Sequence, residues 1–580
     1  MNGQPKPAFY LAVAAVVLGL IAFAAYRSDI FAPKAKPKTN APIDAKELSA
    51  HAEHPDEGPA LMVKEYKLRP RGERLPDPPG AGAYTSLDKT DNTVRFAINV
   101  WAGWGPIILA NNGFAPGHVW KTPEGKEFKV ELVLIDDPVQ MRDAYATGNI
   151  HIGWGTLDML PLFLQGFVDS SGKPKDARIM PRVFQQIDWS NGGDGIVVRD
   201  SIKTVADLRG KKLVLAQNSP SHYFALNMLV SGGVQPSEVE LVPTETAFQA
   251  AAAFNSQKEI AGCVSWAPDI YNLEKVRGNR MLVTTAQANK LITDIWFTRA
   301  DFARDEPGIV EALCRGIFDA MVDLKEESKR QDLAKLMAKG YNIPEPDALA
   351  MQGDAHNTNF AENQQFFLNQ NNPTNFERVW NQSYYLYRRI GTITHQAVAF
   401  DQVMDPSVIE KLAKETKYSS QKDEYKIQLT PKTVSEIRGE KEILTNTVVV
   451  KFFPNSWDLH KKITRKVDGK DVEEMYDPSV DLTLDEIAKL AGQFGAAHII
   501  IEGHTDSSMK GQVPASLVKE LSLNRANSIK EALLQKYKEL EPNRFAVEGM
   551  GWDRPADPND PDNHFKNRRV EVKVYSAEQQ

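Results

Sequence analysis

Residues 204–224 read TVADLRGKKLVLAQNSPSHYF, and this stretch indicates how the middle of the chain folds. The apolar run 212–216 predicts a strand, and the residues from Pro220 onward predict a helix. Ser219 and Ser221 fall at the start of that helix, where hydroxyl groups and free backbone N–H groups bind anions well. The stretch therefore predicts an α/β layer with a ligand-binding edge.

The same alternation of strand and helix extends on both sides of this stretch. The runs 94–100, 130–136 and 195–198 are β-like, and segments of helical character lie between them. From Asp301 onward the pattern is mainly helical. Short strands that alternate with helices predict an α/β fold, and we place this unit at residues 92–417.

Four tryptophans fall near predicted strand ends of this unit: Trp101, Trp104, Trp154 and Trp266. In open α/β sheets, ligands bind beyond the carboxyl ends of the strands, and small-molecule sites are largely apolar with a few polar anchors. We therefore expect a solute site built from these tryptophans with Ser219 and Ser221. Core or interlobe packing of the tryptophans, and a simple helix cap at Ser219, remain open as alternatives.

A second, smaller unit at residues 445–580 has an α+β pattern. The strands expected there are 446–453 and 498–503, followed by two more near the end of the chain. Thr483 and Glu486 are spaced as a capping box before a short helix. An amphipathic helix follows at 521–538.

Two charged residues of this unit suit a zwitterionic ligand. Asp506 directly follows a predicted strand, and Arg525 lies near the start of the next predicted helix, so both can occupy one rim. A carboxylate binds an ammonium group, and a guanidinium binds a carboxylate through two parallel hydrogen bonds. The alternative is a turn cap at Asp506 and a surface salt bridge at Arg525.

The C-terminal unit resembles the OmpA-like peptidoglycan-binding family. The resemblance rests on GHTD at 503–506, LSLNRA at 521–526, the Gly549/Gly551 segment and NRRV at 567–570. It implies non-covalent binding of the diaminopimelate of the peptidoglycan stem by Asp506 and Arg525, with Thr505, Asn455 and Arg568 in secondary positions. The loop between Asp506 and Arg525 is longer than is usual in the family, and Val518 replaces an asparagine.

The middle unit resembles the periplasmic solute-binding proteins of ABC importers, in the branch for nitrate, aliphatic sulfonates and taurine. The resemblance rests on 204–224, on WAGWGP at 101–106 and on VSWAPD at 264–269. It implies two α/β lobes that close on a small, anionic solute, with an ABC permease or an envelope complex as a further partner. Ala261 and Ala267 replace acidic residues that are frequent in that branch, so the solute stays open.

The N-terminus contains an uncharged apolar run at 9–26, after a short tail at 1–8. We interpret this run as a single transmembrane anchor, which would place the protein in the inner membrane with its bulk in the periplasm. A cleaved signal peptide is the alternative, since Ala22 and Ala24 fit a cleavage site. Proline and charged residues dominate 27–91, which predicts a linker. A second linker or lead-in strand is expected at 418–444.

Composition excludes several classes of protein. The chain has 580 residues, a formal charge of -7 and no basic block, so nucleic acid is a poor partner. The two cysteines, Cys263 and Cys314, are too few for a disulfide scaffold or a cysteine-rich metal site, and we expect buried free thiols. They also disfavour the cysteine-dependent thiamine-pyrimidine synthase of the same superfamily. The sequence has no P-loop, HExxH or nucleophile elbow, so we expect neither an enzyme, nor a cofactor, nor a metal.

Together these patterns predict a non-catalytic envelope protein that binds a solute and attaches to peptidoglycan. The solute could be imported or sensed, and the sequence leaves this open. The alternative is a scaffold between membrane and wall, in which the receptor-like unit binds a protein partner. A cleft filled by aromatic side chains would favour the scaffold.

Overall fold

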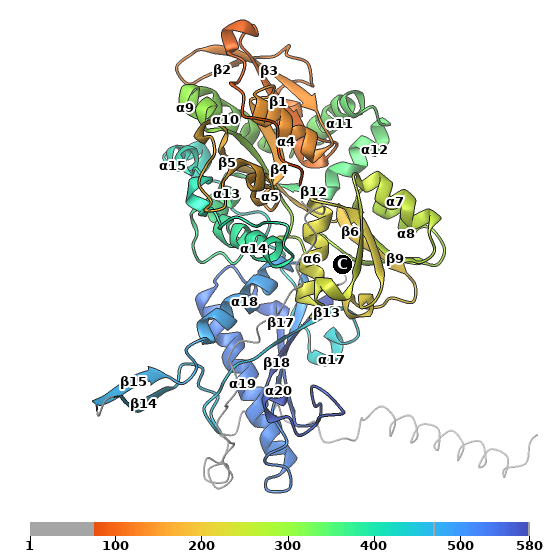
Figure 1. The fold of residues 1–580 in the computed structure, drawn as a ribbon, viewed down its shortest axis with the longest axis vertical. Helices are drawn as coiled ribbons and strands as arrows, with labels where there is room; N and C mark the ends of the chain where they lie inside the picture. Colours follow the sequence, from red (N-terminus) through yellow and green to blue (C-terminus); the bar gives the residue numbers. More distant parts are fainter. Residues whose placement is uncertain (1–74, 468–469, 578–580) are drawn as a thin grey trace, which may run out of the picture. The chain divides into compact units, whose positions relative to one another are not determined.

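The computed structural model describes residues 75–467 and 470–577. The predicted anchor at 9–26 and most of the predicted linker at 27–91 lie outside these residues. No helix in the described ranges is both long and apolar enough to span a membrane. The described part holds three larger sheets and one two-stranded ribbon (Figure 1). The middle unit contains two of the larger sheets, as expected for two α/β lobes.

The first lobe is built on a mixed sheet with the order β12-β5-β11-β4-β1-β3-β2. Strand β1 runs parallel to β3 and β4, whereas β11 is antiparallel to β4 and β5. Phe96 in β1 and Trp296 in β11, the strands on either side of β4, pack together in the core. The strands are β1 (Thr93–Ile98), β2 (Val119–Lys121), β3 (Glu127–Leu134), β4 (Ile152–Thr156), β5 (Pro181–Ser190), β11 (Thr293–Arg299) and β12 (Ala355–Asn357).

The second lobe is built on a sheet with the order β10-β6-β9-β7-β8. Strands β7, β8 and β9 are parallel, and β6 is antiparallel to β9 and β10. Helices α6, α7 and α8 pack beside this sheet (Figure 1). Its elements are β6 (Asp194–Arg199), β7 (Lys212–Ala216), α6 (Pro220–Ser231), β8 (Glu240–Thr244), α7 (Ala247–Ser256), β9 (Ile260–Trp266), α8 (Asp269–Glu274) and β10 (Asn279–Thr284).

Two neighbouring segments connect the lobes. The chain passes from β5 to β6 through 191–193 and returns from β10 to β11 through 285–292. Thr285 joins the segments, because its Oγ1 accepts a hydrogen bond from Gly192 N at 2.9 Å and lies 2.8 Å from Ser190 Oγ. A pair of short, mutually bonded connections is the arrangement expected of a hinge.

The remaining helices of the middle unit pack around these sheets. They cover most of the stretch beyond Ala300 that the sequence predicts to be helical. Their bounds are α3 (Gly105–Ala110), α4 (Pro138–Thr147), α5 (Met159–Phe167), α9 (Ala300–Asp305), α10 (Pro307–Asp323), α11 (Glu327–Tyr341), α12 (Glu345–Ala350), α13 (Phe360–Leu368), α14 (Phe376–Arg389), α15 (Ser407–Leu412) and α16 (Thr416–Ser419).

The last part of the predicted first linker is packed rather than extended. Residues 75–91 lie against the first lobe, where Pro76 O accepts a hydrogen bond from Arg142 at 2.7 Å and Gly82 O accepts one from Arg299 at 2.7 Å. Both arginines are buried, and a buried guanidinium needs acceptors for its N–H groups. The backbone carbonyls of residues 75–91 supply these acceptors. The amino-acid composition of the segment does not indicate that buried arginines bind it.

The second predicted linker, 418–444, is also partly packed. Tyr425 is buried and stacks on His356 with ring centroids 3.8 Å apart, and its hydroxyl donates to Asn191 in the hinge at 2.9 Å. Beyond it lie α17 (Val434–Ile437) and the first strand of the next sheet, which begins at Lys441. Part of the segment is therefore a lead-in strand, one of the two forms expected.

The C-terminal unit is a four-stranded sheet with the order β13-β18-β16-β17, packed by two long helices. Helix α19 lies directly on the sheet, since a Cβ atom at Gly503 would stand 2.1 Å from Ser522 O and one at Gly549 would stand 2.1 Å from Lys519 O. The elements are β13 (Lys441–Val448), β14 (Lys462–Val467), β15 (Lys470–Met475), α18 (Val480–Gln493), β16 (Ala497–His504), α19 (Ala515–Lys536), β17 (Phe545–Gly551), α20 (His564–Asn567) and β18 (Val570–Ser576).

The predicted capping box at Thr483 is wrong, because α18 already begins at Val480. Asp477 organises the chain before this helix: its Oδ1 accepts a hydrogen bond from Ser479 N at 2.9 Å, and its Oδ2 accepts one from Lys451 N at 3.0 Å. Thr483 is buried inside the helix and its N–H donates to Ser479 O at 3.1 Å. The tertiary contacts of Asp477 thus extend the helix by about one turn.

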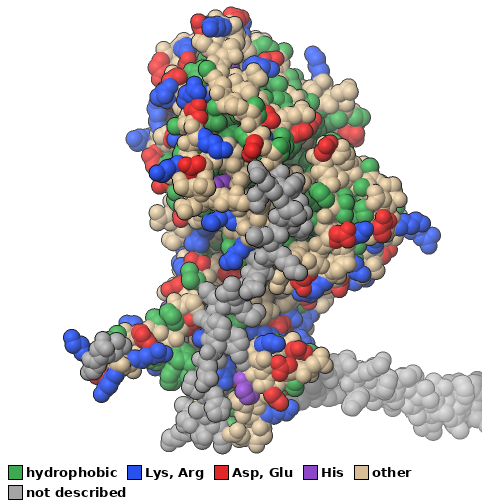
Figure 2. All heavy atoms as spheres, viewed as in Figure 1, with side chains coloured by type: hydrophobic (Ala, Val, Ile, Leu, Met, Phe, Trp, Pro, Cys, Tyr) green, Lys and Arg blue, Asp and Glu red, His purple; other side chains and the backbone are tan. Residues whose placement is uncertain are grey.

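Both cysteines are buried and unpaired, as predicted: Cys263 lies in β9 and Cys314 in α10. The molecular surface carries both signs of charge. On the face drawn in Figure 2, Lys and Arg side chains are interspersed with Asp and Glu side chains.

Candidate functional site

The residues predicted to bind solute follow strands from both lobes. Trp101 comes after β1, and Ser219 and Ser221 come after β7. Trp266 is the last residue of β9 and is half-buried. Trp154 differs, because it lies in the middle of β4 rather than at its end. The strand ends that face a ligand in an α/β fold therefore carry most, but not all, of the predicted set.

Trp101 lies between the first lobe and the hinge. Its indole N–H donates to Asp188 Oδ2 at 3.1 Å, and its ring lies so close to Gly193 that a Cβ there would stand 2.4 Å from the ring edge. Glycine is the only residue that fits beside this ring. Trp101 thus places an aromatic ring beside the hinge and donates a hydrogen bond to the buried carboxyl group of Asp188.

Trp104 and Trp154 are packed as core residues. The Trp104 side chain is fully buried, and its indole N–H donates to Asn99 Oδ1 at 2.7 Å. The indole N–H of Trp154 donates to Ile135 O at 2.8 Å. This packing corresponds to the alternative that the sequence left open for the tryptophans, and a solute contact by either ring stays a prediction.

The start of α6 brings two serine hydroxyls to the end of β7. Asn218 has a φ of 59°, a left-handed conformation that asparagine tolerates, and it turns the chain sharply into the helix. Ser219 Oγ donates to Ala216 O at 2.8 Å and makes no side-chain cap. Ser221 Oγ is buried and has no hydrogen-bond partner. Ser221 is therefore the hydroxyl with unused bonding capacity.

Carboxyl groups that the sequence analysis did not select converge near the hinge. Asp188 in β5 stands directly opposite Asp294 in β11, and the two carboxyls hydrogen-bond to each other. Asp194, the first residue of β6, accepts a hydrogen bond from Ser190 Oγ at 2.6 Å. Burial raises the pKa of Asp188 to about 7 and that of Asp194 to about 7, and it raises the pKa of Asp294 well above the usual range.

A fourth carboxyl group, that of Asp158, lies just beyond β4. The residue caps α5 by position but makes no side-chain cap bond, and its Oδ2 is buried without a partner. Burial raises its pKa to about 8, and the charge of Asp194 adds to the shift. The burial of Asp158 could not be predicted from the sequence, because it depends on contacts between segments that are far apart in the chain.

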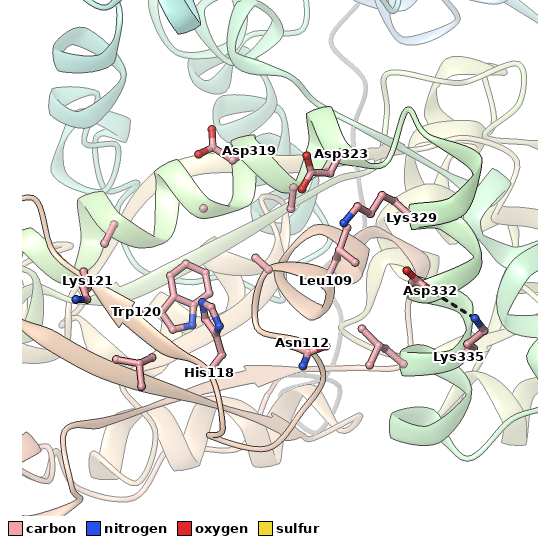
Figure 3. Close-up of a pocket in the computed structure, with 16 residues that line it drawn as sticks. Leu109, Asn112, His118, Trp120, Lys121, Asp319, Asp323, Lys329, Asp332 and Lys335 are labelled. Carbon is pink, nitrogen blue, oxygen red and sulfur yellow. Dashed lines mark hydrogen bonds and ion pairs between the residues drawn. The ribbon is translucent and has the colours of Figure 1, made fainter.

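One open pocket of the first lobe lies away from the predicted solute residues. It has a volume of about 770 Å³ and lies between β2, α10 and α11, where Trp120 and His118 face Asp319 and Lys329 (Figure 3). Asp332 and Lys335 form an ion pair of 3.2 Å on α11. None of the residues predicted to bind solute lines this pocket, which is at the edge of the sheet.

In the C-terminal unit, Asp506 contacts Arg568. The Arg568 Nε donates to Asp506 Oδ2, and Ser508 N donates to Asp506 Oδ1 at 2.7 Å. Burial by itself would raise the pKa of Asp506, but hydrogen bonds from Ser508 and the charge of Arg568 outweigh it and lower the pKa. Asp506 is thus held as a carboxylate. The direct partner is Arg568, which the sequence analysis assigned only a secondary position.

Arg525 corrects two expectations. It lies well inside α19, which begins at Ala515, and not near the start of that helix. It is also only 4% exposed, which excludes the surface salt bridge that the sequence left open as the alternative. Its Nε donates to Ser456 O at 2.9 Å, and its guanidinium lies 5.0 Å from the ring centroid of Phe452. The residues 508–514, which look like a loop extension, end just before this longer helix.

Two further predicted residues flank this site. Thr505 is buried, and its Oγ1 has no hydrogen-bond partner. Asn455 is half-buried and has a φ of 57°, so it forms a tight left-handed turn. Arg525, Arg568 and Phe452 line one small pocket beside Thr505. Donor groups and a carboxylate therefore lie together at the end of β16, as a zwitterion requires.

A nearby group of ligand-type side chains is already charge-balanced. Glu502, His504 and Glu571 bring one ligand atom each within 4.8 Å of one another. Glu502 is paired with Arg438 at 2.7 Å and with Lys573 at 3.1 Å. Hydrogen bonds from His504 and Arg438 and the charge of Lys573 lower the pKa of Glu502 to about 2, against the opposing effect of burial. The local positive charge makes the group a poor cation site.

Comparison with known proteins identifies both units. Residues 191–329 match the family described as NMT1/THI5 like, and residues 473–569 match the OmpA family. The taurine-binding periplasmic protein of Escherichia coli (strain K12) is 27% identical over 229 residues, which cover 38% of this chain and 66% of that protein. Outer membrane protein Omp38 of Acinetobacter baumannii is 34% identical over 100 residues, which cover 17% of this chain and 26% of that protein.

Among solved structures, the periplasmic aliphatic sulphonate binding protein SsuA from Escherichia coli is similar, with a TM-score of 0.41 and 19% identity, over 55% of this chain and 99% of that chain. The nitrate-binding protein NrtA from Synechocystis PCC 6803 has a TM-score of 0.41 and 14% identity, over 56% and 89%. The family matches confirm both resemblances seen in the sequence. The chain joins a solute-binding domain of the NMT1/THI5-like type to a C-terminal domain of the OmpA family.

Proposed function

We propose that this protein is a non-catalytic component of the cell envelope that binds a small sulfonate-type solute and attaches to peptidoglycan. The names of its relatives support an envelope location, since they describe a periplasmic and an outer membrane protein. Phe9–Tyr26 would tether the protein to the inner membrane. The two binding activities belong to separate units and are argued separately.

One observation carries the solute-binding proposal: buried polar atoms without partners come from both lobes at the strand ends. They include Ser221 Oγ after β7, Ser265 Oγ near the end of β9 and Asp158 Oδ2 after β4. A buried polar group without a hydrogen bond costs free energy, about 1–3 kcal/mol each. A bound ligand that contacts these atoms would recover that cost. The relative that binds taurine supports a sulfonate as the anionic part of the ligand.

A thermal-shift panel on the full chain tests this proposal. Sulfonates, phosphonates, nitrate, amines and amino acids are added one at a time. A ligand at about 100 times its dissociation constant adds about 2.7 kcal/mol to the stability of the domain that binds it. We expect a shift with a sulfonate, which Ser221→Val abolishes. The absence of a shift with every compound would refute the solute-binding function.

The wall-binding proposal rests on the site at the end of β16. Asp506 is a buried carboxylate suited to an ammonium group, and Arg525 and Arg568 provide guanidinium groups for a carboxylate. The match to the OmpA family supports diaminopimelate as the ligand. Asp506 already contacts Arg568. On binding, Asp506 would contact the ammonium group of the ligand and Arg568 would contact its carboxylate, so the two residues would no longer pair with each other.

Co-sedimentation with isolated sacculi tests the wall site. Asp506→Asn and Arg568→Ala should each lower binding at least tenfold, since removing one partner of a buried charge pair costs about 2–5 kcal/mol. The third variant is Arg525→Lys. We choose lysine because alanine would leave Ser456 O without a hydrogen-bond donor. Arg465→Ala in the exposed ribbon β14 is the matched control. Unchanged binding by the first two variants would refute the assignment.

One observation favours the scaffold as a second candidate. The ring of Trp101 lies against Gly193, and Trp104 and Trp154 use their indole N–H groups within the protein. Aromatic side chains therefore fill space that a solute could occupy. In this case the receptor-like unit would bind a protein partner, and no compound of the panel would shift its thermal transition.

A further inference from the structure

The centre of the receptor unit gathers four buried carboxyl groups. Asp188 and Asp294 face each other across β5 and β11, Asp194 opens β6, and Asp158 follows β4. Their residues are 0%, 5%, 3% and 1% exposed, in that order. The cluster, which we call the acidic cluster, therefore joins the strand ends of the first lobe to the hinge.

The acidic cluster contacts neutral donors only. Asp188 accepts from the indole of Trp101, and Asp194 accepts from the hydroxyl of Ser190. None of the ion pairs found within residues 75–467 and 470–577 includes any of the four aspartates. Because a buried carboxylate without a cation is costly, the cluster is either protonated or neutralised by a charge from outside the described chain.

Strand register brings the four groups together. Asp294 stands opposite Asp188 in β5 and opposite Thr156 in β4, two residues before Asp158. Asp194 is bonded to Ser190 at the end of β5. The charge of Asp194 raises the pKa values of Asp158, Asp188 and Asp294, and the charge of Asp158 also raises that of Asp294. Like charges that share a buried site cannot all ionise. A single cation placed among them would lower the free energy of every ionised form at once.

Buried hydroxyl groups without hydrogen-bond partners lie on elements that contact β6 and α5, and they are a second, independent indication of a ligand. Ser265 Oγ belongs to the residue opposite Gly195, next to Asp194, and Ser221 Oγ lies in the first turn of α6. The Tyr387 hydroxyl on α14 is buried without a partner, and burial raises its pKa, with a further contribution from the charge of Asp158. Both lobes and α14 thus contribute unused bonding capacity beside the acidic cluster.

We propose that the acidic cluster is a subsite for the ammonium group of a zwitterionic solute, whose anionic end lies at the start of α6. This inference rests on the proposed solute-binding function and deepens it. The unit would therefore select solutes that carry both charges, in place of the simple anion expected from the sequence. An ammonium group has three donors, which suits several acceptors spread around it.

The geometry favours an organic ammonium over a metal ion. A metal needs three or more oxygen ligands that converge at one point. Within the described residues, the one group of His, Cys, Asp or Glu atoms that converges in this way is Glu502, His504 and Glu571, in the other unit. The acidic cluster does not converge as metal ligands do.

Titration calorimetry on the full chain separates the possible outcomes. The probes are taurine, which is a sulfonate with a primary ammonium group, and ethanesulfonate, which lacks that group. We expect taurine to bind at least about thirtyfold more tightly, as the loss of one partner of a buried charge pair requires. Asp294→Asn and Asp188→Asn should each remove this preference, while Asp347→Asn, an exposed aspartate of α12, should keep it.

Each result has one meaning. Equal affinity for taurine and ethanesulfonate would overturn the ammonium subsite and leave the proposed function standing. No binding of either probe would refute the sulfonate-type function itself. Heat from Ca²⁺ or Zn²⁺ alone that disappears in Asp294→Asn would overturn the ammonium assignment in favour of a metal. Two aspartate variants are used so that the test still works if one of them misfolds. Circular dichroism shows whether each variant is folded.

Discussion

The two candidate sites bury carboxylates under opposite conditions. In the C-terminal unit, Glu502 has Arg438 and Lys573 as partners, and Asp506 has Arg568. In the receptor unit, Asp188, Asp194, Asp294 and Asp158 have no cationic partner in the described chain. The pKa of Glu502 is lowered to about 2, whereas that of Asp158 is raised to about 8.

This difference separates a preformed site from an incomplete one. A carboxylate that a cation of its own chain neutralises stays ionised at neutral pH. A carboxyl group that lacks a cation keeps its proton until a positive charge arrives. The wall site should therefore gain little stability on binding, because the ligand replaces the contact between Asp506 and Arg568, while the receptor site should gain more from its ligand.

The largest contrast should appear when one carboxylate is neutralised in each unit. Glu502→Gln removes the fully buried partner of Lys573 and Arg438, which keep only the more exposed Glu571 and Glu548 as partners in the described chain, and should destabilise the C-terminal unit by about 3 kcal/mol. Asp294→Asn replaces a carboxyl group that already holds its proton in the unliganded protein, so the receptor unit should keep its stability. Hydrogen exchange in β16 and in β11 measures the two effects separately.

Glu473→Gln in the exposed ribbon β15 is the matched control and should change neither unit. If Asp294→Asn destabilised the receptor unit as strongly as Glu502→Gln destabilises its own, the aspartate would have a cationic partner after all. The comparison between the two units would then fail.

The two units should also respond to pH with opposite signs. Asp188 and Asp194 have pKa values of about 7, above the ordinary 3.8, so the folded receptor unit holds protons that the unfolded chain releases. Its stability should fall as the pH rises from about 4 through about 7. Glu502, with a pKa of about 2 against the ordinary 4.5, stabilises the C-terminal unit above pH 4.5. That contribution is lost as the pH falls from 4.5 towards 2.

Hydrogen exchange of unliganded protein at pH 5 and pH 8 measures this, after correction for intrinsic exchange rates. Between these values we expect weaker protection of β5 and β11 at pH 8 and little change in β16. Asp354, with a pKa of about 6 raised by burial, contributes in the same direction. Protection of β5 and β11 that grew with pH would contradict the assignment of raised pKa values.

The smallest expected effect concerns Trp101. Trp101→Phe removes the indole N–H that donates to Asp188 at 3.1 Å and keeps an aromatic ring beside Gly193. One neutral hydrogen bond contributes about 0.5–1.5 kcal/mol, so taurine affinity should fall about threefold to tenfold. Calorimetry measures it, with Trp457→Phe at an exposed tryptophan as the control. A loss as large as that of Asp294→Asn would show that Trp101 contacts the solute itself.

Strand and helix order could be predicted from the sequence because it depends on local periodicity. The runs around Phe96 and Val214 are strands, and Ser219 stands before α6, as expected. Boundaries that depend on tertiary contacts could not be predicted. Asp477 extends α18 beyond the expected start, and buried Arg142 and Arg299 hold residues 75–91 against the lobe.

The candidate sites show the same limit. The wall residues Asp506, Arg525 and Arg568 stand in an ordered set of motifs and could be selected. The acidic cluster could not be selected from the sequence. Its four aspartates are not grouped in one motif, and no local pattern predicts that they converge or that they are buried. Only the register of β5 with β11 places Asp188 opposite Asp294.

Proton release on solute binding tests the central claim most directly. Taurine is titrated into the full chain at pH 6.5 in buffers of different ionisation enthalpy, which gives the number of protons exchanged. If an ammonium group enters the acidic cluster, the carboxyl groups ionise and protons are released. Asp188→Asn combined with Asp294→Asn should abolish most of this release. Taurine binding by the unaltered protein without any proton release would contradict the account.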